Sequence, residues 1–394
     1  MAITKLHAGE IKDYIRYIVK NNEKLQESGL VPVAVSIMGE AGLGKTSVVK
    51  QLGKELGKEV VKINLAQVEE LGDIIGFPIK EHQVCKTEDE SDCQWINEHA
   101  IETYSKNGYK LTGRNRMSYA APEWIANKTE GVLLLLDDWT RADTRFLNAV
   151  MDLINEQAYI SWTMPKGSTI ILTENPDNGS YMVNSIDDAI RTRFTNIEMV
   201  FDVKQWAKFA EEQGIDGRCI NFLLLNPEIV NHKVNPRSLV TFFNSIRGVT
   251  DFSTKEGLSI IQMIGEGSIG EAATATFITF INNKLDKLVT PEFIMTSASK
   301  DLKKEMDAIV GRTNLKNYRA DIASVLCIRT VNYMINHSKT KPVDKDLLDR
   351  IEELAIDEYF GPDLSYHMVK TLFAANPKFK VLATRNKLTK HVIG

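Results

Sequence analysis

Cysteine is scarce in this chain, with four in 394 residues, which is too few for a disulfide framework. We therefore expect all four thiols to be reduced. A large excess of one charge is also missing. The 48 basic and 52 acidic residues leave a net charge of −4, which excludes a global attraction to nucleic acid or anionic membranes. No apolar run approaches the roughly 20 residues that span a bilayer. The N-terminus alternates charged and apolar residues, unlike a signal peptide, so the sequence predicts a soluble cytoplasmic protein without membrane partners.

Apolar residues are plentiful at 43%, enough to fill two or three domains. Strand and helix patterns alternate over the first 200 residues, which indicates a doubly wound parallel sheet. The pattern weakens between about 72 and 124, which indicates an insertion. The sequence therefore predicts an α/β core over 1–200, a small helical lid over 201–250 and an additional all-helical C-terminal region over 251–394.

A glycine-rich stretch, GEAGLGKT, matches the P-loop pattern G-x-x-x-x-G-K-[ST] and lies between a predicted strand and a predicted helix. Its backbone amides and the following helix N-terminus suit a phosphate chain, although a glycine turn before a helix also arises by chance. Lys45 is expected to reach the β- and γ-phosphates, and the Thr46 hydroxyl to bind Mg²⁺. ATP and Mg²⁺ are thus the predicted ligands. The predicted nucleotide-binding residues are Gly39, Glu40, Ala41, Gly42, Leu43, Gly44, Lys45, Thr46 and Ser47.

Two adjacent carboxylates, Asp137 and Asp138, end the apolar run LLLL. A short apolar run between polar residues is typical of a central strand, whose C-terminal end lies where ligands bind in open α/β sheets. Asp137 is expected at the tip of a strand neighbouring the P-loop, where it would hold Mg²⁺, and Asp138 would orient the attacking water. The alternative for both is capping of the next helix.

The order of these and later motifs resembles the AAA+ ATPases and, within them, the MoxR-like group. The matching segments cover residues 10–250 and read GEAGLGKT, DDWTRAD, TENP, IDDAIRTRF and NPRSL. The resemblance implies that Asn175 is the first sensor and that Arg237 is the second sensor, on a lid helix. It implies that Arg193 is an arginine finger for the neighbouring subunit, with Arg191 as the second candidate. For each arginine, a solvated surface cation is the alternative.

One residue departs from the family pattern. The resemblance leads us to expect glutamate at position 138, and Asp138 is one methylene shorter. Because a general base must be placed to within about an ångström, we expect hydrolysis that is real but slow.

Three weaker patterns remain. His82, Cys85, Cys93 and His99 are four potential zinc ligands in the insertion, although their spacing matches no common zinc finger and an acidic loop separates them. The stretch AYISWTMPKG predicts a hairpin, whose aromatic residues would contact a substrate or pack against the core. The tail 365–394 carries six basic and no acidic residues, which suits nucleic acid or a solvated helix face.

Together these features predict a Mg²⁺-dependent ATPase that forms a ring, because an arginine finger acts on a neighbouring subunit. The ring is expected to be hexameric. The resemblance implies a protein partner to be remodelled, often one with a von Willebrand A-type domain. Two rival functions stay open. The basic tail favours a motor or loader acting on nucleic acid, and the shorter Asp138 favours a nucleotide-gated scaffold with little turnover.

Overall fold

The computed structural model describes residues 3–392 apart from 87–91, 180, 185, 187, 232, 314–315 and 358. The chain divides into two compact units, Met1–Val200 and Phe201–Gly394. The first unit spans the segment predicted as the α/β core.

The first unit is built on a six-stranded sheet in which all five neighbouring pairs are parallel. Its strands, in spatial order, are β1 (Thr4–Leu6), β11 (Phe194–Met199), β2 (Ala34–Met38), β10 (Thr169–Glu174), β7 (Leu133–Asp137) and β3 (Val60–Asn64). This confirms the predicted parallel sheet. One detail was wrong: the acids were expected on a strand next to the P-loop strand β2, but β10 lies between β2 and β7.

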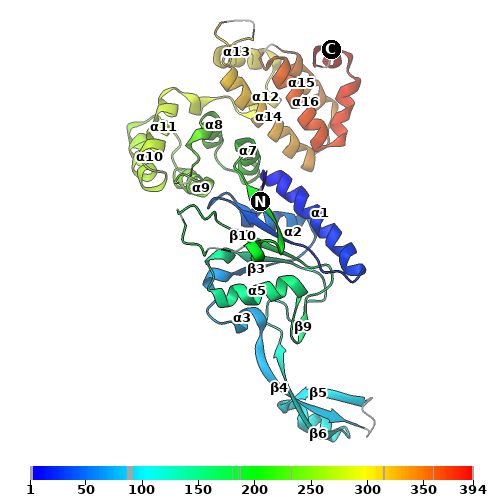
Figure 1. Ribbon diagram of the computed structural model, residues 1–394. Coiled ribbons are helices and arrows are strands. Elements are labelled where there is room, and N and C mark those ends of the chain that lie inside the picture. Colours follow the sequence, from blue (N-terminus) through cyan, green and yellow to red (C-terminus); the bar gives the residue numbers. More distant parts are fainter. Residues whose placement is uncertain are drawn as a thin grey trace. The chain divides into compact units, whose positions relative to one another are not determined.

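Helices cover both faces of this sheet, as Figure 1 shows. They are α1 (Ala8–Glu27), α2 (Lys45–Leu56), α3 (Gly72–Ile75), α5 (Thr144–Glu156) and α6 (Asp188–Arg191). The leucines of β7 alternate between the two faces. Leu133 and Leu135 pack in the hydrophobic cluster that contains α1 and α2, and Leu134 and Leu136 pack in the cluster that contains α5. Burial on both faces explains why the run is continuously apolar.

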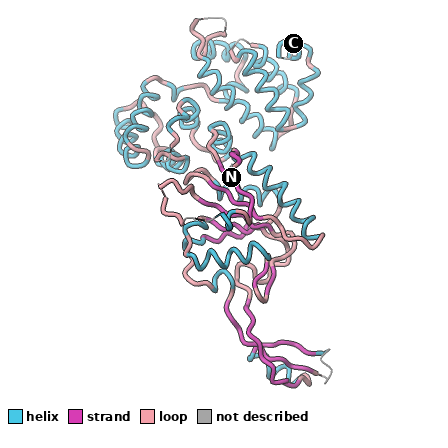
Figure 2. The backbone as a smooth tube through the Cα atoms, viewed as in Figure 1, coloured by secondary structure: helices cyan, strands magenta, loops and turns pink. Residues whose placement is uncertain are grey.

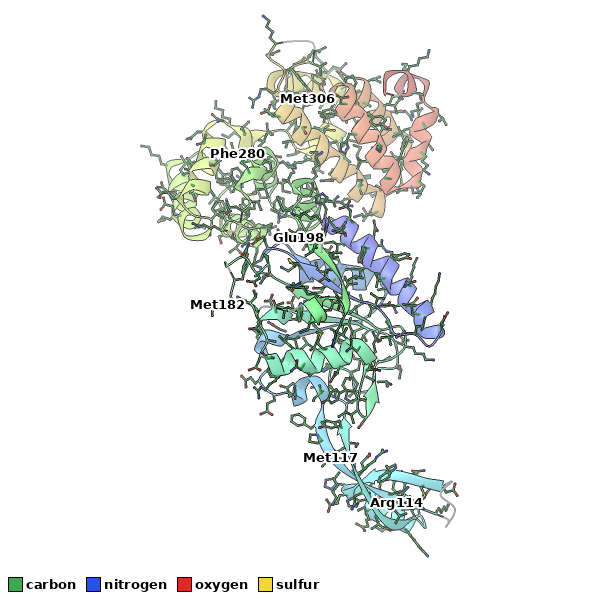
Figure 3. All side chains as sticks on the ribbon, in the orientation of Figure 1. Arg114, Met117, Met182, Glu198, Phe280 and Met306 are labelled. Atoms are coloured by element: carbon green, nitrogen blue, oxygen red, sulfur yellow. A yellow bond between two sulfur atoms is a disulfide. The ribbon has the colours of Figure 1, made fainter. Side chains whose placement is uncertain are left out.

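The predicted insertion contains a three-stranded antiparallel sheet, which we call the arm (residues 77–120). Its strands, in the order β5-β4-β6, are β5 (Cys93–Asn97), β4 (Phe77–Cys85) and β6 (Lys110–Ala120), and it carries the short helix α4 (Ile101–Lys106). Figure 2 shows its strands in magenta, and Arg114 and Met117, labelled in Figure 3, lie on β6.

Two cysteines of the arm, Cys85 and Cys93, form a disulfide between β4 and β5. The prediction of four reduced thiols is therefore wrong for this pair, while Cys219 and Cys327 are free and buried. The zinc hypothesis is also wrong, because both candidate thiolates are consumed. Among the described residues, no group of three or more His, Cys, Asp or Glu side chains could hold a metal ion.

Thiol titration tests this pairing directly. We expect two reactive thiols per chain when the protein is denatured without reductant, because Cys219 and Cys327 are free while Cys85 and Cys93 are joined. Denaturation after reduction should give four. Four thiols before reduction would contradict the disulfide, and a Cys85→Ser, Cys93→Ser double variant serves as the control with two under both conditions.

The second unit consists of helices and the loops between them, with no strand among its described residues. Its helices are α7 (Val203–Glu212), α8 (Gly217–Leu225), α9 (Pro236–Ser245), α10 (Lys255–Ser268), α11 (Glu271–Asn282), α12 (Pro291–Thr296), α13 (Ser299–Ile309), α14 (Ala320–Thr340), α15 (Lys345–Ile356), α16 (Gly361–Ala375) and α17 (Asn386–Val392). Nowhere in the described parts of the chain is a helix long and apolar enough to cross a membrane.

Two hydrophobic clusters fill this unit, marked in Figure 3 by Phe280 and Met306. The cluster of Phe280 joins α7, α8 and α9 to α10 and α11, so the last two helices pack with the segment predicted as the lid. In the basic tail, Arg385 forms ion pairs with Asp349 and Glu352, which neutralises part of the tail's charge within the chain.

Candidate nucleotide site

The P-loop owes its shape to glycines. Gly42 and Gly44 have φ angles of 79° and 99°, a left-handed backbone that other residues rarely adopt. A Cβ atom on Gly39 would lie 2.9 Å from the main-chain oxygen of Met199, so only glycine lets β11 approach this closely. The Gly39 N–H donates to the carbonyl of Glu174 at 3.2 Å, which joins the start of the loop to the end of β10.

Lys45 begins α2 and is only 7% exposed. Its Nζ donates to the carbonyls of Gly39 at 2.5 Å and Glu40 at 3.1 Å, and to Oδ1 of Asn175 at 3.0 Å. The P-loop lysine and the residue predicted as the first sensor are thus in direct contact. Both side chains come from the C-terminal edge of the sheet, because Asn175 follows the last residue of β10.

Asp137 lies at the tip of β7, and its Oδ1 accepts hydrogen bonds from the hydroxyls of Thr46 at 2.8 Å and Thr173 at 2.5 Å. Its Oδ2 forms an ion pair with Lys62 Nζ at 2.7 Å. Partial burial would raise the pKa of this carboxyl, but hydrogen bonds from Lys62, Thr173 and Thr46 outweigh it, and the net pKa is lowered. The group is therefore a carboxylate at neutral pH.

These oxygens fit a magnesium ion. Mg²⁺ prefers hydroxyl, carboxylate and water oxygens, and a hydroxyl and a carboxylate lie 2.8 Å apart at the end of the loop. Thr46 and Asp137, the two predicted metal ligands, are brought together even though β10 separates their strands. Lys62 was missed by the sequence analysis. The contact of Lys62 with Asp137 depends on the pairing of β3 with β7, which the sequence alone does not show.

Asp138 has a left-handed backbone, with φ 52° and ψ 39°. Few residues other than glycine adopt this conformation, and such outliers cluster at functional sites. Its N–H donates to the Thr173 hydroxyl at 3.2 Å, and its carboxylate, 32% exposed, lies 3.9 Å from an Arg141 nitrogen. The side chain does not cap the short helix that follows, η4 (Trp139–Arg141). The capping alternative is thus not what the structure shows for Asp138.

A tyrosine that the sequence analysis missed contacts the P-loop. The Tyr181 hydroxyl donates to Oε2 of Glu40 at 2.5 Å and accepts from the Ala41 N–H at 3.2 Å. Burial and the bond to the Glu40 carboxylate raise the Tyr181 pKa. The chain after β10 therefore contacts two of the nine predicted nucleotide-binding residues, Glu40 and Ala41.

The three predicted arginines have different surroundings. Arg191 is half-buried, and its Nη1 pairs with Glu174 Oε1 at 3.2 Å. Arg193, two residues later, is exposed. Arg237 is exposed near the start of α9 in the second unit, so its role as the second sensor stays a prediction.

The predicted hairpin is present as β8 (Ala158–Tyr159) and β9 (Trp162–Thr163). Its aromatic residues pack inward: Tyr159 meets Tyr119 edge to face, and Trp162 meets Trp124 in the same way. The packing alternative is therefore correct, and Ile160 at the tip of the hairpin is 73% exposed. These contacts join the hairpin to the base of the arm.

The solved structures that are similar to this chain are distant from it in sequence. No family model matches the chain. Two mutants of the Thermotoga maritima protein RuvB are similar at 13% and 14% identity, covering 73% and 74% of this chain and 76% and 84% of theirs, with TM-scores of 0.36 and 0.38. A closed state of Hsp104 with ATPγS and casein is similar at 14% identity over 69% of this chain and 46% of that chain, with a TM-score of 0.31.

The fold is therefore assigned from the chain's own architecture. A parallel six-stranded sheet carries a P-loop between β2 and α2 and an acidic pair, Asp137 and Asp138, at the end of β7. A polar residue, Asn175, follows β10, the strand that lies between β2 and β7. This is an α/β P-loop NTPase core, followed by a helical C-terminal region.

Proposed function

We propose that this protein is a Mg²⁺-dependent ATPase of the AAA+ type, similar to the MoxR-like group, that works as a ring and remodels a protein partner. One observation carries the proposal. Lys45 contacts Asn175, and Thr46 contacts Asp137, so residues from the P-loop, β10 and β7 meet at one edge of the sheet. Such convergence of a P-loop with a strand-end acid and a polar sensor is what ATP hydrolysis requires.

Each residue has a distinct task in this reaction. The loop amides and the N-terminus of α2 bind the phosphate chain, and Lys45 exchanges its carbonyl partners for phosphate oxygens. Asn175, already 3.0 Å from that ammonium, positions the attacking water against the γ-phosphate. Asp138 accepts the proton of that water. Thr46 and Asp137 would hold Mg²⁺, which would supply neutralisation of the charge on the phosphates.

A neighbouring subunit completes the site. Arg193 is exposed, so its guanidinium is available to another copy of the chain, where it would stabilise charge on the transferred phosphoryl group. Ring assembly, expected to be hexameric, follows from this task. Rotation of the Arg237-bearing lid on hydrolysis, in the cytoplasm, would then remodel a bound protein partner, which in the family it resembles is often one with a von Willebrand A-type domain.

Sizing the protein with and without ATP, while phosphate release is followed, tests the proposal as a whole. We expect a ring in ATP and steady release of phosphate. A monomer that releases no phosphate would contradict it.

A nucleotide-gated scaffold is the second candidate, and Asp138 is the observation that favours it, because its carboxylate is one methylene shorter than glutamate on a left-handed backbone. Rings that persist with ATP and release no phosphate would support this candidate. Stimulation of turnover by DNA or RNA, lost on deletion of 365–394, would instead support a role on nucleic acid.

The Asp138→Asn substitution tests whether Asp138 acts as the general base in hydrolysis. We expect turnover to fall about 10²-fold or more, which is the usual contribution of a general base, while ATP affinity is unchanged. Phosphate release and a fluorescent ATP analogue measure the two effects. Asp143→Asn, at an exposed helix cap nearby, is the matched control and should turn over normally. Equal rates for wild type and Asp138→Asn would remove Asp138 from catalysis.

A further inference from the structure

A buried glutamate beside the nucleotide site has no task in the mechanism above. Glu174 ends β10, is 1% exposed and immediately precedes Asn175. Its Oε1 accepts from the hydroxyl of Ser36 and from the guanidinium of Arg191, both at 3.2 Å. Its Oε2 has no hydrogen-bond partner among the described residues. Burial raises the Glu174 pKa against the opposing effects of Arg191, Ser36 and Lys45.

Such a carboxylate is costly to bury, and its cost is offset here mainly by one arginine. Replacing Arg191 would leave the Glu174 carboxylate with a neutral hydroxyl, that of Ser36, as its one hydrogen-bonding partner among the described residues. The pair is therefore held together more firmly than an exposed ion pair, because its carboxylate end is removed from water.

One end of this pair is fixed to the nucleotide site. The Glu174 carbonyl accepts the Gly39 N–H, which begins the P-loop. The next residue, Asn175, accepts a hydrogen bond from Lys45. Any shift of β10 that follows a change at the P-loop therefore moves Glu174 as well.

The other end is fixed to the segment that presents Arg193. Arg191 is the last residue of α6, and its carbonyl accepts from the side chain of Asn196 at 3.0 Å. The Arg193 N–H donates to the Ile190 carbonyl at 3.1 Å, and the chain enters β11 at Phe194. The backbone around Arg193 is thus held between the Arg191 side chain and the sheet, while its own side chain is exposed.

We propose that the Glu174–Arg191 pair is a positioning device that holds Arg193 in place for the neighbouring subunit's nucleotide. The inference rests on the proposed function, since it needs a ring. It also resolves the two arginine candidates, because Arg191 acts within its own chain and Arg193 acts on the next one. The pair serves the neighbour's site, whereas a pair that merely stabilised the fold would impair the subunit's own site as well.

Mixed rings can tell these outcomes apart. Donor subunits carry Lys45→Ala, which disables their own site but leaves Arg193. Acceptor subunits carry Arg193→Ala, which keeps their site but removes the arginine they would give. Each subunit type is expected to be inactive alone. Mixing the two types should restore turnover at every acceptor site that receives Arg193 from a neighbouring donor.

Glu174→Gln is then added to one subunit type at a time. In donors, we expect turnover of the mixture to fall about 10- to 100-fold, the effect of misplacing a catalytic group by about an ångström. In acceptors, we expect turnover to be unchanged. The affinity of a fluorescent ADP analogue for the acceptors, which does not depend on hydrolysis, should be unchanged too. Glu198→Gln is the matched control in donors. Glu198 lies on β11 in a partly exposed pair with Lys5 and is labelled in Figure 3.

Several results would overturn the inference. Equal losses from donors and acceptors would show a structural role, and no loss from donors would show no role. If the parent mixture itself is inactive, the proposed function fails first, and the inference falls with it. Should Glu174→Gln not fold, Arg191→Gln must give the same loss in donors only, and Arg191→Lys must recover part of it.

Discussion

Replacing Arg193 with alanine is expected to lower ATP turnover about 10³- to 10⁵-fold, which is the range for removal of an arginine finger. The reason is electrostatic. Charge accumulates on phosphate oxygens during transfer, and a guanidinium supplied by the neighbour stabilises it in a site that excludes water. Arg193 is exposed and is not part of the P-loop that binds the nucleotide, so the affinity for ATP should stay unchanged.

Steady-state phosphate release across protein concentrations measures this effect. Arg145→Ala, another exposed arginine of the same unit, is the control and should retain wild-type turnover. Arg191→Ala should also be impaired, but through loss of its pair with Glu174. If Arg193→Ala turned over ATP at the wild-type rate, Arg193 would not be an arginine finger, and the main reason to expect a ring would be lost.

Replacing Lys45 with alanine is expected to lower turnover about 10²- to 10³-fold and to weaken ATP binding as well, because one cation at the phosphates is lost. The structure adds a reason for the size of the effect. Lys45 is already buried among oxygen acceptors from the loop and Asn175, so its ammonium is oriented before a phosphate chain arrives. Such preorganisation is costly to lose.

The control for this change lies on the same helix. Lys50→Ala removes an exposed lysine of α2 and should leave both binding and turnover unchanged. Thermal unfolding of both variants checks that the fold is intact. A Lys45→Ala protein that binds ATP as tightly as the wild type would contradict the assignment of the P-loop.

The features that a sequence reveals are those that neighbouring residues determine. The P-loop is a short segment with three glycines and one lysine whose backbone geometry follows from local conformation, so the place of Lys45 and Thr46 at the start of a helix could be predicted. The same holds for β7, because a strand buried on both faces must be apolar and its end must emerge at the edge of the sheet. Asp137 therefore lies where the sequence predicted it, next to Thr46.

What could not be predicted depends on residues that are distant in sequence. Lys62 reaches Asp137 only because β3 pairs with β7, and the sequence did not show that β10 lies between β2 and β7. Glu174 was overlooked because its burial and its pairing with Arg191 arise from packing. The Cys85–Cys93 disulfide was missed because four cysteines in a long chain suggest reduced thiols, whereas a register between β4 and β5 places these two side by side.

The central claim is that the P-loop and the acid of β7 form one ATP–Mg²⁺ site. Titration of a fluorescent ATP analogue into the wild type and into Asp137→Ala, each with Mg²⁺ and with EDTA, tests it most directly. We predict that Mg²⁺ tightens binding to the wild type and has no such effect on Asp137→Ala. Wild-type binding that does not respond to Mg²⁺, or a variant that responds as the wild type does, would separate the acid from the loop and contradict the account.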